Sequence, residues 1–237
     1  MKNSGIFSSK TLKINYEYIM LKSVEKIKDA YVLYVQDGKD YLRLGGMEKT
    51  FEKLLASNPH LATKMIIVLI HPGSSLERWH SYSRRGNRFK KYIQFMTDEF
   101  IPSIEKEIEA FNINIVKRGY LGDSLAGNLS YNLAMTNPGK CTHLLLQSAA
   151  ISKEDIQLLE SVDHLNWNVY QTVGIYEDDF ISPITNEKMN ILSYNRELND
   201  MLTKKGATIQ YMELEENHEW AIWKRDLPNV LNYFMMN

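Results

Sequence analysis

Short β-prone apolar runs alternate with helix-like stretches along most of this chain of 237 residues, and this alternation constrains the fold more than any other feature. Two runs, at 30–36 and 65–70, are apolar or aromatic at nearly every position, as in strands that are buried on both faces of a sheet. Strands alternating with helices predict a single α/β domain over residues 1–237, with a mostly parallel central sheet and helices on both faces. Further strands are predicted at 113–121, 142–150, 167–175 and 208–214, with helices at 47–58, 89–110, 187–205 and after 220.

Three segments fall outside this alternation. Residues 6–23 alternate loosely between apolar and polar types, which predicts antiparallel strands at an edge of the sheet. Residues 74–90 are polar with a few aromatic side chains and predict a long loop, of a length that is often functional. Residues 151–165 predict a short helix or a small mobile cap.

The composition argues against several classes of function. Lys and Arg number 28 and Asp and Glu number 29, so a net charge of −1 argues against a nucleic-acid surface. Cys141 is the only cysteine, which excludes an internal disulfide and a multi-cysteine zinc site, and we expect neither a metal nor a cofactor. Residues 1–10 lack the apolar core of a secretory signal and no apolar run has the length of a membrane span, so a cytoplasmic protein is expected. The oligomeric state is left open, a homodimer included.

A serine stands between a predicted strand and a predicted helix. The sequence Gly122-Asp123-Ser124-Leu125-Ala126 matches a G-x-S-x-G nucleophile elbow except that alanine replaces the second glycine. In such an elbow a sharp turn holds the serine hydroxyl clear of the sheet, and small neighbours allow the turn to be tight. The same residues are compatible with an ordinary helix start, with Ser124 or Asp123 as the N-cap. Residues further along the chain have to decide between the two.

Reactive residue types follow four of the predicted strands. Lys39, Ser124, the acids at 177–179 and His218 each come after a strand, and the carboxyl ends of parallel strands meet at one edge of a sheet. Serine, then acid, then histidine is the chain order of α/β-hydrolase triads. In that chemistry His218 takes the proton of Ser124 as the serine attacks an acyl carbon, and a carboxylate orients the imidazole. The oxyanion is expected to bind the backbone N–H groups of Leu125 and Lys39.

Five side chains are candidates for substrate binding because their segments are expected at the same edge of the sheet. Tyr41, Trp79 and Tyr82 are expected to form pocket walls. Arg78 is expected either to bind an acidic or catecholate group or to form a surface salt bridge. His71 follows a buried strand, and either lines the pocket or is structural.

Four segments of the sequence are similar to motifs of one enzyme family. Residues 33–42 resemble a first strand with a D-G-x-x-Y-like turn, and 77–83 resemble an R-x-x-E-Y-like segment in which Ser81 replaces the glutamate. Residues 95–105 resemble a helix reading F-x-x-E-L-I-P-x-I-E, and 218–223 resemble an H-D-W-x-x-W ending. Because these motifs occur in the family's order, the chain resembles the putative-esterase family. That family includes enterochelin-type siderophore esterases, S-formylglutathione hydrolases and feruloyl esterase domains.

The resemblance implies an α/β-hydrolase fold and a serine carboxylesterase that hydrolyses small-molecule esters, siderophore-type esters among them, through an acyl-enzyme on Ser124. The family's acid, three residues after a glycine, falls on Glu177, with Asp178 and then Asp179 as alternatives. In some siderophore-type relatives a serine–histidine pair suffices. An S-formylglutathione hydrolase-like thioesterase, an acyltransferase and a catalytically silent binding relative are the other functions that the resemblance leaves open.

Overall fold

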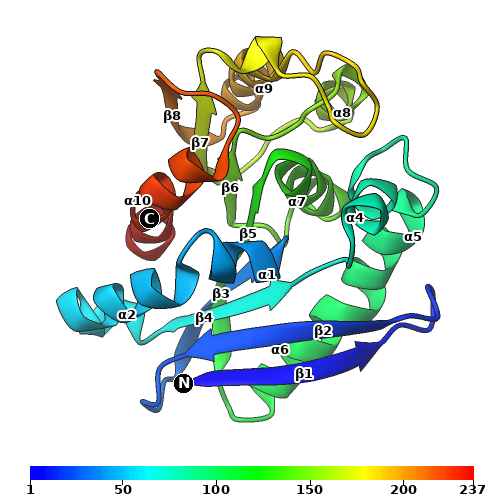
Figure 1. Cartoon of the computed structure of the whole chain (residues 1–237). Helices are drawn as coiled ribbons and strands as arrows, with labels where there is room; N and C mark the ends of the chain where they lie inside the picture. The colour runs from blue at the N-terminus through cyan, green and yellow to red at the C-terminus, as the bar shows by residue number, and fades with distance from the viewer.

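The computed structural model describes all 237 residues, and its centre is an eight-stranded mixed sheet with the order β1-β2-β4-β3-β5-β6-β7-β8 (Figure 1). The strand β2 pairs antiparallel with β1 and with β4, and all other neighbours are parallel. The predicted mostly parallel sheet with antiparallel strands at one edge is therefore confirmed. The strands are β1 (Lys2–Ser8), β2 (Asn15–Lys22), β3 (Asp29–Val35), β4 (Met65–Ile70), β5 (Asn114–Asp123), β6 (His143–Gln147), β7 (Asn168–Gly174) and β8 (Thr208–Leu214).

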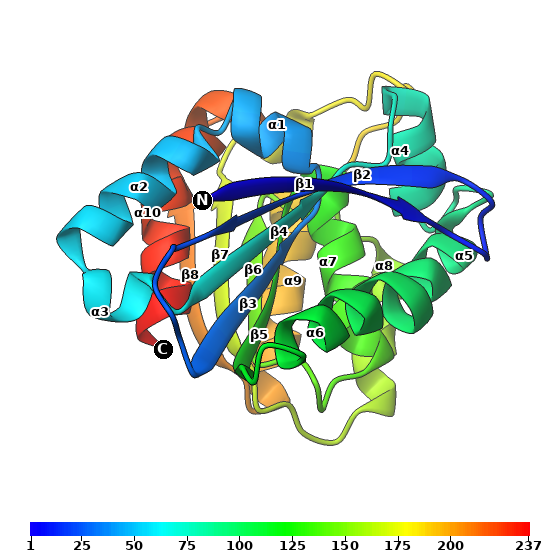
Figure 2. The same ribbon diagram turned by 90° about the horizontal axis from the view of Figure 1, so that it is seen from below.

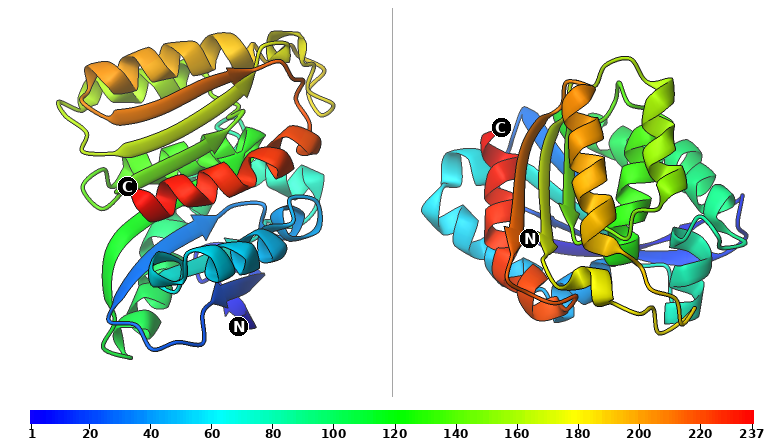
Figure 3. Two further views of the ribbon diagram at one scale, coloured as in Figure 1. Left: turned by 90° about the vertical axis from the view of Figure 1, so that its left-hand side faces the viewer. Right: turned by 90° about the horizontal axis from the view of Figure 1, so that it is seen from above.

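Helices cover both faces of the sheet (Figures 2 and 3). One face carries α1 (Gly38–Arg43), α2 (Met47–Ser57), α3 (Pro59–Ala62) and the C-terminal α10 (Trp220–Met236). The other face carries α4 (Ser75–Tyr82), α5 (Phe89–Gln94), α6 (Ile101–Glu109), α7 (Ser124–Thr136), α8 (Lys153–Gln157) and α9 (Ile191–Lys204). No helix is both long enough and apolar enough to cross a membrane.

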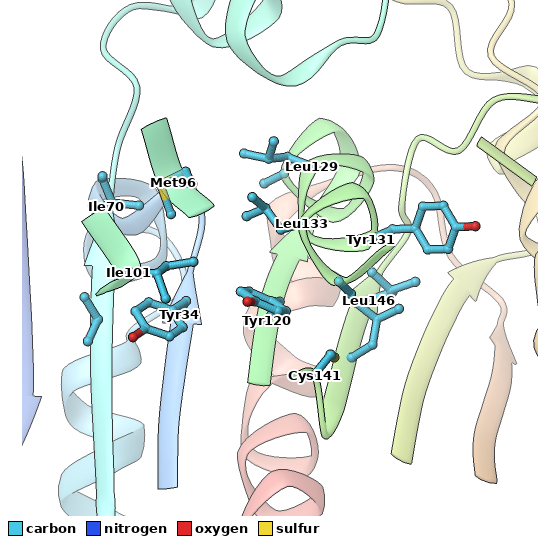
Figure 4. Close-up of a cluster of buried hydrophobic side chains, with 14 of the residues drawn as sticks. Tyr34, Ile70, Met96, Ile101, Tyr120, Leu129, Tyr131, Leu133, Cys141 and Leu146 are labelled. Carbon is cyan, nitrogen blue, oxygen red and sulfur yellow. The ribbon is translucent and has the colours of Figure 1, made fainter. Parts of the chain in front are cut away.

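The central strands bury side chains on both faces, which explains why their sequences read as continuous apolar runs. In β3, Val32 and Tyr34 pack under the layer of α5, α6 and α7, whereas Leu33 and Val35 pack under α2 and α10. Figure 4 shows part of the first core, where Tyr34 and Tyr120 stack with ring centroids 5.9 Å apart. The two cores hold the carboxyl ends of β3, β5, β6 and β7 in one row, at the edge where the site is built.

The prediction of a long loop at 74–90 is wrong. Residues 75–82 form α4, because Ser74 and Glu77 make a capping box that satisfies the free N–H groups of its first turn. In the helix predicted at 89–110, a π-helical turn, η1 (Phe95–Phe100), separates α5 from α6. This irregularity lies just before Pro102, which cannot donate a backbone hydrogen bond to the preceding turn.

The segment 151–165 contains α8 and a 3₁₀ turn, η2 (Leu158–Ser161). The buried Asp155 anchors α8: it accepts hydrogen bonds from Asn128 and Asn132 of α7, and its Oδ1 lies 2.8 Å from Nε of Arg84. The role of this segment as a cap and the single-domain organisation stay predictions.

Candidate active site

Ser124 occupies a strained turn between β5 and α7. Its φ of 47° lies in the left-handed region that residues with a side chain rarely adopt, and such strain is typical of a nucleophile elbow. A Cβ on Gly122 would lie only 2.2 Å from the carbonyl oxygen of Ala126, so the turn requires glycine there. Ala126 is completely buried, so its small side chain fits where the motif usually has glycine. Asp123 makes no capping hydrogen bond, and the geometry is that of an elbow instead of an ordinary helix start.

Ser124, His218 and Glu177 form a continuous hydrogen-bonded chain. The Nε2 atom of His218 is 2.8 Å from Oγ of Ser124, and its Nδ1 atom is 3.1 Å from Oε2 of Glu177. With the Nδ1–H tautomer, the ring donates to the carboxylate and presents a free electron pair to the serine hydroxyl. The side chains of His218 and Glu177 are 4% and 0% exposed, so water competes little for these contacts. The three residues come from three elements that are far apart in the sequence.

Of the three neighbouring acids, only Glu177 reaches the imidazole. All three lie in the 3₁₀ turn η3 (Glu177–Asp179), which follows β7. The carboxylate of Asp178 accepts hydrogen bonds from the backbone N–H and the hydroxyl of Ser193. Asp179 points to solvent and pairs with Lys188 at 3.0 Å. Within this three-residue turn, Glu177 is buried beside the imidazole, whereas Asp178 and Asp179 face elsewhere.

Glu177 is held by groups that the sequence reasoning missed. Its Oε1 accepts the hydroxyl of Ser148 at 2.7 Å and the N–H of Gly174 at 3.0 Å, which leaves Oε2 for the imidazole. The hydroxyl of Ser148 is in turn fixed by Nε1–H of Trp223, 3.0 Å away on α10. Ser148 was assigned to the interior of a strand at 142–150, but β6 ends at Gln147 and Ser148 adopts a φ of 50°. The sequence signal that could have identified Ser148 was its position, a serine close to the carboxyl end of a predicted strand.

Aromatic rings enclose the imidazole of His218. The ring of Phe180 lies 4.2 Å away, centroid to centroid, and that of Trp223 packs edge-on at 5.0 Å. Trp220 packs edge-on against Trp223 at 5.2 Å. These contacts fix the ring plane, so that both nitrogens keep their partners.

Arg78 on α4 contacts two carboxylates near the nucleophile, one in the turn after β3 and one directly before Ser124. Its guanidinium forms an ion pair with Asp37, in the turn after β3, and Nη2 lies 3.7 Å from the carboxylate of Asp123, the residue before Ser124. The two carboxyl groups are 1% and 2% exposed. Burial, together with the neighbouring Asp37, raises the pKa of Asp123 well above its ordinary value, even though Arg78 opposes the shift. Burial also raises the pKa of Asp37. The sequence predicted Arg78 but neither of its partners.

A cleft of about 870 Å³ opens over Ser124 and His218. Its walls come from α1, α4, the start of α7, α8, the loop at 180–189 and the start of α10. Arg78, Trp79 and Leu125, three residues that the sequence analysis named, line it. Trp220, at the start of α10, also lines it. The loop at 180–189 and the segment that leads into α8 contribute apolar wall residues that the sequence did not single out: Ile151, Phe180, Ile184 and Met189.

The other predicted binding residues do not line this cleft. Tyr41 and Tyr82 are fully buried, and their hydroxyls have partners inside the protein. The hydroxyl of Tyr41 donates to Gln147 at 2.9 Å, and that of Tyr82 accepts the N–H of Asp37 at 3.4 Å. They support the turn after β3 and are not pocket walls. His71 and Lys39 line a separate hollow beside β1 and β2.

The turn after β3 nevertheless reaches the cleft through other residues. Asp37 and Asp40 line it, whereas the ammonium of Lys39 pairs with Glu17 at 2.8 Å. Lys39 and Leu125 are among the first residues of α1 and α7, where backbone N–H groups lack a helical carbonyl partner. The side-chain direction of Lys39 does not decide whether its N–H serves the oxyanion, and that role stays a prediction.

One group of side chains has the composition of a metal site. Oxygen or nitrogen atoms of Asp37, Asp40 and His71 lie within 4.8 Å of one another. Arg78 already supplies the positive charge beside Asp37 and occupies one of its oxygens.

Comparisons with known proteins find one matching family and several similar folds. The family described as "Putative esterase" matches residues 18–234 of the chain. Over 198 residues the chain is 27% identical to "Uncharacterized protein YjcH" of Bacillus subtilis (strain 168), covering 82% of this chain and 80% of that one. A ferulic acid esterase superposes with a TM-score of 0.70 at 19% identity, covering 99% of this chain and 97% of its own.

The enterobactin esterase FES from Shigella flexneri, in a structure determined with enterobactin, superposes with a TM-score of 0.79 at 15% identity. The match covers 99% of this chain but only 58% of that one, so this chain corresponds to little more than half of that esterase. At these identities the likeness concerns the fold, and the predicted α/β-hydrolase fold is confirmed.

Proposed function

The chain belongs to the putative-esterase family, and from that premise we propose that it is a serine carboxylesterase that hydrolyses small-molecule esters through an acyl-enzyme on Ser124. The single observation that supports this most is the hydrogen-bonded chain from Ser124 through His218 to Glu177. Residues that meet in this order and at these distances have the geometry of a nucleophile, its base and the acid that orients the base.

In the first step Oγ of Ser124 attacks the ester carbonyl carbon while Nε2 of His218, 2.8 Å away, takes the hydroxyl proton. The imidazolium that forms is stabilised by Glu177 across the 3.1 Å contact with Nδ1. Since both side chains are buried, this charge interaction is stronger than it would be in water. Ser148 and Gly174 donate hydrogen bonds to the other oxygen of this carboxylate and so hold Oε2 towards the imidazole.

The oxyanion of the tetrahedral intermediate binds the N–H of Leu125 and a second N–H from the turn at 37–39, for which Lys39 is the prediction. Collapse of the intermediate breaks the ester C–O bond, and the imidazolium returns its proton to the departing alcohol. Water then attacks the acyl carbon, with His218 as base again, and Ser124 leaves with the proton. No step requires a cofactor.

A cleft of about 870 Å³ with aromatic walls suits a small aromatic or aliphatic ester. The ferulic acid esterase and the enterobactin esterases among the similar structures support small-molecule esters as the substrate class, siderophore-type esters included.

The test is hydrolysis of 4-nitrophenyl acetate and butanoate, a catecholate trilactone and S-formylglutathione by the wild-type protein, Ser124→Ala and a control variant, Ser103→Ala. Ser103 is exposed on α6, away from the cleft. We expect hydrolysis of carboxylic esters by the wild type and the control, and none above background by Ser124→Ala. Tight ester binding without turnover would instead favour a silent binding relative. Preferred turnover of S-formylglutathione would favour the thioesterase.

A further inference from the structure

Every cationic side chain that lines the cleft is already paired with a carboxylate. Arg78 is held by Asp37 and Asp123, and Nε of Arg84 lies 2.8 Å from the buried Asp155. At the rim, Arg85 forms a two-pronged pair with Glu187, and Lys188 lies 3.0 Å from Asp179. No free positive charge is left in the cleft to receive an anionic substrate.

Three carboxylates of the same cleft have no such partner. Asp40 on α1, Glu154 on α8 and Glu219 just before α10 line the cleft, and none of them takes part in an ion pair or a side-chain hydrogen bond. They belong to three different walls, so unpaired negative charge borders the cleft on three sides. Glu219 also adjoins Trp220 in the sequence, and both residues line the cleft, so an aromatic ring lies on the same wall as a free carboxylate.

We propose that the cleft selects esters by charge, taking those with a cationic group most readily, uncharged esters next and anionic ones least. This inference rests on the proposed function and names the substrate class of the same site. It means that a polyanionic ester, such as an iron-loaded catecholate, is a poor substrate, whereas an uncharged iron-free trilactone is not disfavoured by charge.

The physical reason lies in what each kind of substrate has to displace. An anionic group can gain Arg78 or Arg84 only by breaking an existing ion pair, which leaves a buried carboxylate unpaired. At the exposed rim pairs of Arg85 and Lys188 this cost is smaller. A cationic group meets carboxylates that are free. Charges lining a cleft with apolar walls act on the arriving substrate at longer range than isolated surface charges do.

The experiment compares three acetate esters whose alcohol parts have similar size but different charge: the acetates of choline, 3,3-dimethylbutanol and 3-hydroxypropanesulfonate. The ratio kcat/KM of each is measured in a pH-stat at 20 mM ionic strength and divided by its rate of hydrolysis by hydroxide. We expect the order cationic, neutral, anionic, with on the order of 10-fold between the first and the last. At 0.5 M salt the range should shrink to about 2-fold, because the charges are screened.

The triple variant Asp40→Asn, Glu154→Gln, Glu219→Gln should bring the cation-to-anion ratio close to 1. The matched control, Glu25→Gln, Glu52→Gln, Glu109→Gln, makes the same change in net charge at exposed positions away from the cleft, and should keep the wild-type ratio.

An equal or reversed order in the wild type, or the same drop in ratio in both triple variants, overturns the charge selection. Failure of the wild type to hydrolyse any of the three esters, or the 4-nitrophenyl esters above, would instead contradict the proposed esterase function.

Discussion

Replacing Arg78 with methionine tests whether this residue stabilises the walls of the site or only binds substrate. Methionine keeps much of the apolar volume of the side chain but removes the guanidinium that lies between Asp37 and Asp123. The two carboxyl groups, 1% and 2% exposed, would then face each other without a cation.

Removing one partner of a buried ion pair costs about 3–5 kcal/mol, and we expect Arg78→Met to lower the free energy of unfolding by that amount at pH 8. The cost should fall in acid, because a buried carboxyl can escape its charge by binding a proton. The pKa of Asp123 is raised by burial and by Asp37, so this group binds its proton more tightly in the folded protein than in the unfolded chain. A raised carboxyl pKa favours the folded state at low pH, and this advantage is lost as the pH rises through the folded value. At pH 5 the deficit of the variant should therefore be smaller by about 1–2 kcal/mol.

The assay is urea denaturation at pH 5 and pH 8, followed by tryptophan fluorescence. Arg196→Met is the control, because Arg196 pairs with Glu213 on the exposed surface, and its effect should be much smaller and independent of this pH change. Adding Asp37→Asn to Arg78→Met should restore part of the lost stability. A loss below about 1 kcal/mol at pH 8, or a loss that grows as the pH falls, would refute the role of Arg78 as a buried clamp.

Three further predictions concern single residues. Glu177→Gln should lower kcat for 4-nitrophenyl acetate by on the order of 10³–10⁴-fold, while Asp178→Asn changes it by less than about 3-fold; equal mild losses would point to a serine–histidine dyad. Gly122→Ala should lower the free energy of unfolding by about 3 kcal/mol in urea denaturation, because the new methyl group meets the carbonyl of Ala126 at 2.2 Å; a neutral substitution would contradict the described turn. Burial lowers the pKa of His143 to about 4, so its contribution to stability is present above its unfolded value near 6.5 and is lost as the pH falls towards 4. Between pH 7.5 and 4.5 the wild type should lose about 2 kcal/mol more than His143→Gln, and identical urea midpoint shifts would contradict this.

The fold could be predicted from the sequence because buried parallel strands leave a strong signal. The runs at 65–70 and 208–214 coincide with β4 and β8, since every residue or every second residue there meets a packed layer. The reactive residue types that follow the predicted strands likewise predicted that Ser124 and His218 lie at the same edge of the sheet. The helix α4 was missed because its short polar sequence has little apolar periodicity, and only the pair Ser74 and Glu77 marked its beginning.

The contacts that hold the site residues in place could not be predicted, because they join residues that are far apart in the sequence. Tyr41 looked like a wall residue, but its hydroxyl turns inward to Gln147, whose amide in turn donates to Asp226. The partnership of Arg78 with two distant carboxyls arises where helix α4 meets the carboxyl ends of β3 and β5, and no local spacing signals it. The spacing of three residues from Gly174 favoured Glu177 as the acid. That Glu177 and not Asp178 faces the imidazole depends on the 3₁₀ turn in which both lie.

Labelling with a fluorophosphonate, followed by mass spectrometry of the intact protein and its peptides, tests the central claim most directly. We expect a single adduct, located on Ser124, which forms much more slowly in His218→Ala and not at all in Ser124→Ala. An unmodified wild-type protein, or equal labelling of Ser124→Ala, would contradict it.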